Sequence, residues 1–308
     1  MESDSFHGLE CQRSDVDLEI ENDVFEVPHR MVFKALGIFE RIGKLQKFVE
    51  DHSEVKTIFD FDLAIGGDMR QKEKFRFQAV HSLLRNEIPE KLKPAMDRHV
   101  EIMQSITENP KHRKFLDEFM RKQMEIYITN SYGFRNRGGD CIGSGIFPLA
   151  SFFNHSCSPN VSRITVDNKL AFITTRPIEK NQQLFVCYRD NFMRTSKATR
   201  QDYLLKSYRF QCSCEACAKN FAVIDDLFTD DFWFVEPPTE MPPAREAKLE
   251  FKSNCAYIDK HIKNYPNSEI CTLMERNREI LSSLGRVASI KPWKSKWIQR
   301  NLGYVKLL

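Results

Sequence analysis

The chain has 308 residues, of which 41% are hydrophobic and 29% are charged, and its formal net charge at pH 7 is +3. Such a composition is typical of a globular protein with enough residues for a full core and for two domains. The small net charge gives no argument for a nucleic-acid or membrane partner. No stretch approaches the roughly 18 apolar residues that span a bilayer, and the N-terminus lacks the features of a signal peptide. We therefore expect a cytoplasmic and/or nuclear protein.

The cysteines also indicate a reducing compartment. They are nine in number and unevenly spaced, which suits metal ligands better than a disulfide framework. Near the N-terminus, His7 and Cys11 are spaced for one zinc ion on a helical turn. A zinc site normally needs four ligands, however, and no further cysteine lies close by in the sequence. Residues 12–28 are acidic and irregular and indicate a linker.

Helical periodicity dominates residues 29–130. Apolar side chains recur with the spacing of a helix that has one face in a core. The predicted helices are the stripe from Met31 to Val49, residues 72–85, residues 92–106 and a helix that starts at Asn109-Pro110, with a turn-rich break at Gly66-Gly67. These stripes predict a helical subdomain and not a cofactor-binding segment.

The pattern changes after Asn130, where glycines become frequent and favour turns. Three β-rich runs follow, and Ser196 is placed to cap a helix. The predicted elements are strands at Val161–Val166, Leu170–Thr175 and Gln183–Tyr188, a hairpin turn at Asp167-Asn168, and a helix from Ser196 to Tyr208. Helices followed by short strands predict an α+β fold with an irregular sheet.

The segment Asn154-His155-Ser156-Cys157-Ser158-Pro159-Asn160 is the polar centre of this region. It follows the apolar run Ile146–Leu149 and adjoins Phe152-Phe153, so its amide, imidazole, hydroxyl and thiol groups should lie beside a core. Unpaired burial of such groups costs on the order of a few kcal/mol. Alone, the segment could be a polar turn, but the motifs that follow favour a functional site.

The strongest metal signal is Cys212-Ser213-Cys214-Glu215-Ala216-Cys217. Three thiolates in a C-x-C-x-x-C spacing can surround one zinc ion from a single tight loop, and a structural zinc needs a fourth ligand from elsewhere in the chain. The alternative is a set of three reduced surface cysteines, which the density of the cluster argues against.

After residue 220 the chain contains two proline pairs and then amphipathic patterns near 244–264 and 267–284, which predict a linker followed by two helices. The end, Lys291–Leu308, mixes basic and aromatic residues, which can bind single-stranded nucleic acid. A solvated helix face is the simpler interpretation and the one that we favour.

Four motifs, in this order, carry a resemblance to SET-domain protein methyltransferases. They are Gly143-Ser144-Gly145-Ile146-Phe147-Pro148, the segment Asn154–Asn160, Cys187-Tyr188 and the cluster Cys212–Cys217. The first two together are similar to the form found in the SMYD (SET and MYND) family. The resemblance implies an α+β fold with a SET-domain (β-clip-like) core, a helical insert, a zinc-bound post-SET loop and a helical C-terminal tail.

The same resemblance implies a division of the chain. Residues 1–28 would hold a linker and the end of a MYND zinc finger, with His7 and Cys11 as its last two ligands. The further parts are the helical insert 29–130, the C-terminal part of the SET core 131–208, the post-SET zinc loop 209–220 and the helical C-terminal region 221–308. The family places two SET strands and a Gly-x-Gly turn ahead of the finger, so we expect an N-terminally truncated chain.

Position by position, the resemblance implies residues for the cofactor, the reaction and the metal. S-adenosylmethionine would be bound by Asn154, His155, Tyr188 and Phe210. Tyr188 would be the catalytic tyrosine, and Tyr208 would line the channel for the substrate lysine. The zinc ligands would be Cys157, Cys212, Cys214 and Cys217. Asn130-Ser131 is a weaker match to residues near the channel.

These roles imply S-adenosylmethionine-dependent methylation of protein lysine side chains. Methyl transfer to an amine gains its rate mainly from alignment and desolvation, an aromatic channel favours the neutral amine, and aromatic faces attract a sulfonium. The expected partners are a protein substrate that carries the target lysine and transcriptional or chaperone proteins. No membrane or nucleic-acid partner is expected.

One segment within the motif region departs from the family pattern. Lys180–Leu184 stands where the family has a Gly-Glu-Glu-type turn, and Asn181 tolerates the left-handed backbone that glycine would supply, so the turn is predicted to survive. The alternative function is a non-catalytic, zinc-stapled protein-interaction scaffold or transcriptional co-regulator, motivated by the SET strands that a truncation would remove. The sequence specifies neither the substrate protein nor the number of methyl groups transferred.

Overall fold

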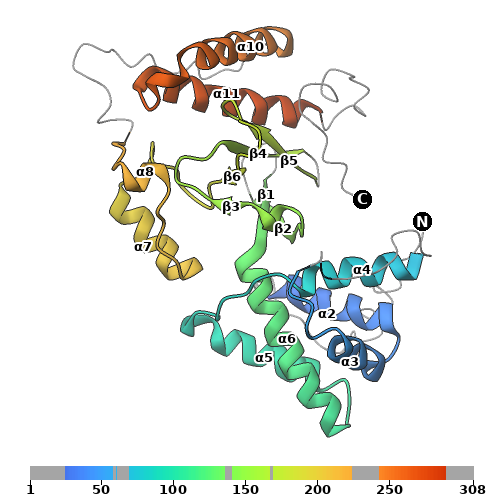
Figure 1. Ribbon diagram of the computed structural model, residues 1–308. Coiled ribbons are helices and arrows are strands. Elements are labelled where there is room, and N and C mark those ends of the chain that lie inside the picture. Colours follow the sequence, from blue (N-terminus) through green and yellow to red (C-terminus); the bar gives the residue numbers. More distant parts are fainter. Residues whose placement is uncertain are drawn as a thin grey trace. The chain divides into compact units, whose positions relative to one another are not determined.

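The computed structural model describes residues 25–57, 60, 69–135, 141–166, 169–223 and 243–288 (Figure 1). They belong to two compact units, Met1–Gly133 with Cys141–Ser151 and Phe134–Asp140 with Phe152–Leu308. Helices predominate in this described part, and its strands form three two-stranded sheets and no closed barrel. The predicted mixture of helices and short strands is confirmed. Several predicted features lie outside the described residues: His7, Cys11, Gly66-Gly67, Asp167-Asn168 and Lys291–Leu308.

The first unit is mainly helical. Its helices are α2 (Glu26–Phe39), α3 (Ile42–Asp51), α4 (Met69–His81), the 3-10 helix η2 (Glu90–Leu92), α5 (Lys93–Gln104) and α6 (Pro110–Asn130). The predicted start of α6 is confirmed, because the Asn109 side chain accepts hydrogen bonds from the backbone N–H groups of Lys111 and His112. After α6 the chain forms β1 (Ser131–Arg135) and β2 (Cys141–Ile146), which pair with each other.

The apolar stripe from Met31 to Val49 is divided between two helices. Glu40 adopts a left-handed backbone with φ of 63° and ends α2, since its N–H donates to the carbonyl of Leu36. The Glu40 carboxylate then pairs with Lys44 and Arg70. The stripe continues across the break because α3 packs on the same core as α2.

The core of the first unit is formed by fully buried side chains of four helices and the residue before α2, among them Phe25, Val32, Leu45, Met103 and Met120. It also contains a pair of buried histidines, His29 on α2 and His99 on α5. Their Nδ1 atoms are 3.1 Å apart. Since one Nδ1 must donate and the other accept, this contact requires at least one unprotonated ring.

The second unit begins with the 3-10 helix η3 (Ala150–Phe152), at its boundary, and two small sheets. In the first, β3 (Asn154–His155) pairs in parallel with β6 (Phe185–Val186), with Asn154 opposite Phe185 and His155 opposite Val186. In the second, β4 (Val161–Val166) pairs antiparallel with β5 (Lys169–Thr174). The two predicted strands of this hairpin are confirmed to within one residue.

The third predicted strand, Gln183–Tyr188, is regular only at Phe185–Val186. The reason is the side chain of Asn160, a residue that is only 1% exposed. Its side-chain amide donates to the carbonyl of Gln183 at 2.9 Å and accepts from the N–H of Phe185 at 2.7 Å. A side chain thus occupies backbone groups that a neighbouring strand would otherwise bind.

Helices complete the second unit. They are α7 (Lys197–Tyr208), α8 (Glu215–Ala218), α10 (Ala244–His261), the 3-10 helix η4 (Ile262–Asn264) and α11 (Ser268–Ala288). The predicted cap of α7 is confirmed, because Ser196 Oγ accepts from the N–H of Thr199. In Figure 1, α11 lies along the β4–β5 hairpin, where Leu281 packs against Ile164 and Ile173. None of the helices in the described part combines the length and the apolar character needed to cross a membrane.

Candidate functional site

Parallel pairing of β3 with β6 builds the centre of the site. The pairing continues one residue further, where the N–H of Ser156 donates to the carbonyl of Val186 at 3.0 Å. The polar groups of the segment then find partners. Ser156 Oγ accepts from the N–H of Ser158 at 3.1 Å, and the Ser158 hydroxyl contacts that of Tyr265 at 2.8 Å. These bonds offset the cost of placing polar groups beside a core.

His155 connects this segment to Tyr188. The backbone N–H of Tyr188 donates to Nδ1 of His155 at 3.1 Å, so Nδ1 is unprotonated. The proton of the neutral ring therefore lies on Nε2, which is 3.3 Å from Sγ of Cys157 and donates to it. Burial lowers the pKa of His155 to about 4, which keeps the ring neutral near pH 7.

Aromatic rings gather around His155. The ring centroid of Tyr188 is 5.1 Å from that of His155 and 4.7 Å from that of Tyr208, and Phe210 lies 6.0 Å from His155. Tyr208 ends α7, and the left-handed backbone of Arg209, with φ of 60°, turns the chain directly before Phe210. Burial raises the pKa of Tyr188, and its neutral hydroxyl donates to the carbonyl of Phe153 at 2.9 Å.

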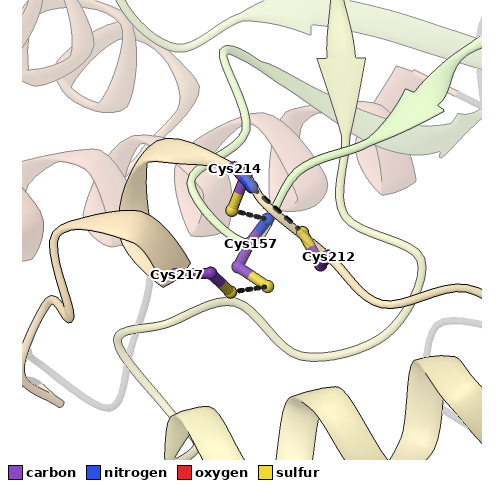
Figure 2. A group of neighbouring side chains, drawn as sticks. All are labelled: Cys157, Cys212, Cys214 and Cys217. Carbon is purple, nitrogen blue, oxygen red and sulfur yellow. Dashed lines mark hydrogen bonds between the residues drawn. The ribbon is translucent and has the colours of Figure 1, made fainter.

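The four predicted metal-ligating cysteines come together in the structure (Figure 2). The rings of Tyr188, Tyr208 and Phe210 pack against the core cluster to which these cysteines belong. They are Cys157, Cys212, Cys214 and Cys217, and their sulfur atoms lie within 4.8 Å of one another. Cys157 comes from the segment after β3, whereas the other three come from the loop after α7 and from α8. The structure thus brings to the C-x-C-x-x-C cluster the fourth sulfur that a tetrahedral zinc site requires.

The surroundings of the four sulfurs fit a bound metal ion. Backbone N–H groups point at them: that of Cys157 donates to Sγ of Cys214 at 3.3 Å, and that of Cys214 to Sγ of Cys212 at 3.5 Å. Hydrogen bonds with Cys157 and Cys212 hold the pKa of Cys214 well below that of a free thiol, while bonds with Cys212 and Cys214 raise that of Cys157. The thiols compete for protons, and a divalent cation would replace those protons.

Gln201 of α7 holds the cysteine loop in place. Its side-chain Nε2 donates to the carbonyl of Cys212 at 2.6 Å, and its Oε1 accepts from the N–H of Cys212 at 2.9 Å. Nearby lies a cavity of about 300 Å³. Arg200 and Tyr203 of α7 line it together with His155 and Arg189. The helix therefore contributes to the thiol cluster, the aromatic cluster and the cavity.

Two predicted residues stand apart from these clusters. Asn154 is exposed on β3. Asn130 belongs to the first unit, where its amide donates to the carbonyls of Leu84 at 2.7 Å and Ile126 at 2.8 Å.

Three further residues of the site carried no local signal in the sequence. Tyr265 binds Ser158 across 107 residues of chain and lies under the guanidinium of Arg176, 5.1 Å from the ring centroid. Gln201 of α7 binds the cysteine loop, and the neighbouring Arg200 is buried and lines one cavity with His155. A run of polar residues on a helix gives no indication of which of them is buried, so only the fold identifies them.

The chain is similar to known proteins over one region. Residues 40–189 match the family model of the SET domain. A SET and MYND domain-containing protein of Dictyostelium discoideum is 34% identical over 104 residues, which cover 33% of this chain and 24% of that protein. The protein-lysine N-methyltransferase SMYD4 of Pongo abelii is 40% identical over 76 residues, 25% of this chain and 10% of that protein. The histone-lysine N-methyltransferase SMYD3 of Mus musculus is 30% identical over 125 residues, 41% of this chain and 29% of that protein.

The matched segments span less than a third of each of these relatives. The names of these relatives describe either the SET and MYND domains or the methylation of lysines in proteins.

Proposed function

We propose, from the match of residues 40–189 to the SET-domain family model and from the similarity to SET and MYND domain-containing proteins, that this chain is a SET-type protein-lysine N-methyltransferase. Its cofactor would be S-adenosylmethionine and its substrate a protein with an accessible lysine. The observation that carries the proposal is the aromatic cluster of Tyr188, Tyr208 and Phe210 around the neutral His155. We expect it to act in the cytoplasm and/or the nucleus.

The residues present fit a cationic cofactor. The faces of the half-buried rings of Tyr188 and Tyr208, whose centroids are 4.7 Å apart, offer the negative potential that attracts a sulfonium. Asn154, His155 and Phe210 are the further residues that we assign to cofactor binding. When bound, S-adenosylmethionine supplies a methyl group on a positively charged sulfur.

The chain's own residues then align the lysine and exclude water. Tyr208 would line the channel, where aromatic walls lower the pKa of the lysine by disfavouring its ammonium form. Tyr188 would orient the amine through its hydroxyl oxygen, whose proton is already donated to Phe153. Because burial keeps this phenol neutral, it can accept an N–H of the amine without ionising. Alignment and desolvation provide most of the rate in such a transfer.

We also propose that Cys157, Cys212, Cys214 and Cys217 bind one zinc ion, which ties the loop carrying Phe210 to the segment after β3. The four-sulfur donor set and the N–H groups directed at it support zinc. The role is structural, since four protein ligands leave no open position for a reactant.

Replacement of Tyr188 tests the enzymatic proposal. We expect Tyr188→Phe to lower kcat on the order of 100-fold, the cost of losing one positioned hydrogen-bonding group beside the reacting atoms. The measurement is incorporation of labelled methyl groups from S-adenosylmethionine into lysines of a protein extract, read by mass spectrometry. The matched control is Tyr257→Phe, because the exposed Tyr257 hydroxyl on α10 contacts only Glu269 in the described hydrogen bonds.

Calorimetry separates the two candidate functions. Binding of S-adenosylmethionine together with lysine methylation supports the enzyme. Binding of zinc without binding of the cofactor and without methylation would contradict it and would favour a non-catalytic interaction scaffold.

A further inference from the structure

Arg200 carries a buried positive charge near the start of α7. The residue is 4% exposed. Its Nη1 donates to the backbone carbonyl of Thr195. Its Nε and Nη2 atoms are buried as well, and they have no hydrogen-bond partner within the described residues. Two strong donors of one side chain are therefore left without a well-formed bond.

Such an arrangement requires a nearby negative charge. A guanidinium stays protonated in proteins, and burial of an unpaired ion costs several kcal/mol. Across the described ranges, Arg200 has no ion pair with a carboxylate within 4.0 Å. The first turn of α7 also carries the positive end of the helix dipole, which adds to the unfavourable field.

The thiol cluster is the source of negative charge that the structure offers. Gln201, the next residue on α7, is bound to the backbone of Cys212 through both its Nε2 and its Oε1. Leu204, one helical turn after Arg200, packs in the same core cluster as Cys157. Arg200 also lines one cavity with His155, whose Nε2 is 3.3 Å from Sγ of Cys157. The packing of α7 therefore places Arg200 beside the thiol cluster.

We propose that Arg200 is a positioning residue of the metal centre, which donates N–H groups to the Cys157 thiolate and balances the charge of the four-sulfur site. The inference rests on the zinc site proposed above. Four thiolates and one zinc ion carry a net charge of −2, which is costly to bury without a cation. A guanidinium beside the ligands offsets part of it, and the metal-bound thiolate supplies the anion that Arg200 needs.

The same sulfur also accepts the Nε2–H of His155 at 3.3 Å. Cys157 would thus receive donors from Arg200 and from the ring that holds the backbone of Tyr188. Partners of this kind fix the orientation of a metal ligand and tune its donor strength. Arg200 would in this way couple the metal centre to the position of the proposed catalytic tyrosine.

Zinc affinity of the full chain, measured by competition with a chromophoric chelator, tests the role. We expect Arg200→Met to weaken zinc binding by about 10- to 100-fold, the usual effect of losing such a partner of a ligand. Arg200→Lys, which keeps the charge but not the planar fork, should restore part of the affinity. Arg189→Met is the control, because Arg189 lines the same cavity with a side chain that is 60% exposed and stacks on Tyr203.

Cobalt substitution gives a readout that a merely structural role would not change. N–H bonds to a thiolate lower the energy of its lone pairs, so their loss should move the sulfur-to-cobalt charge-transfer band to longer wavelength. We expect this shift in Arg200→Met, a smaller one in Arg200→Lys and none in Arg189→Met.

Unchanged zinc affinity and an unchanged band in folded Arg200→Met would overturn the role of Arg200 and leave the zinc site intact. A wild-type chain that binds no zinc would overturn both. Circular dichroism of each variant establishes that the comparison is made on folded protein, and if Arg200→Met does not fold, Arg200→Lys is judged by the same two outcomes.

Discussion

At the scale of single residues, His155 has one arrangement available. Its Nδ1 accepts from the backbone of Tyr188 and its Nε2 donates to Cys157. A second proton on the ring would break the bond to Tyr188. Because burial lowers the pKa of His155 to about 4, both bonds persist from neutral pH down to mildly acidic conditions. A pH dependence of cofactor binding between pH 6 and 8 would therefore have to come from another group.

Lys122 on α6 is a second residue whose surroundings decide its chemistry. Its ammonium donates to Nε2 of the buried His81 at 2.9 Å. Burial, with the nearby charge of Arg85, lowers the pKa of Lys122 to about 8. The side chain lines a cavity of about 670 Å³ in the first unit, so a small reagent can reach it.

We predict that Lys122 reacts with limiting acetic anhydride at pH 7 at least about tenfold faster than Lys114, because a lowered pKa leaves more of the nucleophilic neutral amine. Lys114 is a suitable reference since it lies on the same helix, lines the same cavity and has a side chain that is 81% exposed. Peptide mass spectrometry measures both rates, and the Lys122 rate should rise with a midpoint near pH 8. Equal rates at the two lysines would contradict the prediction.

At the scale of elements, packing of α2 on α5 makes the first unit sensitive to acid. His29 and His99 join the two helices through their Nδ1 atoms, at 5% and 0% exposure. Burial, followed by the charge of His99, lowers the pKa of His29 to about 4. In the unfolded chain a histidine titrates near 6.5. Between these two values the unfolded state binds more protons than the folded state, so stability falls as the pH falls.

We predict that lowering the pH from 7 to 5 reduces the free energy of unfolding by about 2 kcal/mol through the titration of His29 alone. Urea unfolding followed by circular dichroism at the two pH values measures the change. His29→Gln should flatten this dependence, whereas His112→Gln, on α6, is the control that should leave it intact. A pH slope that is the same in the His29 variant would show that other groups cause the acid sensitivity.

Local signals account for the elements that the sequence predicts. Asn109 and Ser196 cap their helices through bonds to residues two or three positions away, and Asn181 adopts the expected left-handed backbone with φ of 67°. The break at Glu40 escaped prediction because the apolar stripe runs through it and neither glycine nor proline stands at residues 39–41. The shortened third strand escaped because its cause, the clamp by Asn160, joins residues more than 20 positions apart.

The features of the site also fall into those that a local sequence pattern predicts and those that only the fold reveals. The C-x-C-x-x-C spacing indicates a metal from sequence alone, but the need for Arg200 near Cys157 arises only when α7 is packed on the cysteine loop. A buried arginine and an exposed arginine look identical in a sequence.

At the scale of the whole molecule, each of the two units has a core of a different composition. The first has a core of aliphatic, methionine and phenylalanine side chains. In the second, the cysteines are themselves part of the core, where Cys157, Cys212 and Cys217 pack with Phe192 and Leu204. Metal binding at such a place adds its free energy to folding.

We predict that Cys157→Ser loses zinc and that amide exchange then rises throughout the loop of residues 209–220, with little change in α5 and α6 of the first unit. Hydrogen exchange with mass spectrometry, with and without a chelator on the wild-type chain, makes the comparison. Cys255→Ser on α10 is the control, because Cys255 lies outside the four-sulfur cluster. An increase spread evenly over both units would argue against a zinc-dependent second unit.

The contact between Ser158 and Tyr265 has a consequence for biosynthesis. The two hydroxyls are separated by 107 residues, and Cys217 follows Cys157 by 60. At ribosomal rates of about 5–20 residues per second, the partner of Ser158 is made about 5 to 20 s later. Throughout this interval the nascent segment exposes a thiol and hydroxyls that the finished protein buries, and the proposed zinc ion cannot gain its fourth ligand until Cys217 has left the ribosome. The order of translation thus makes this segment the point at which a nascent chain needs protection from oxidation and from premature association.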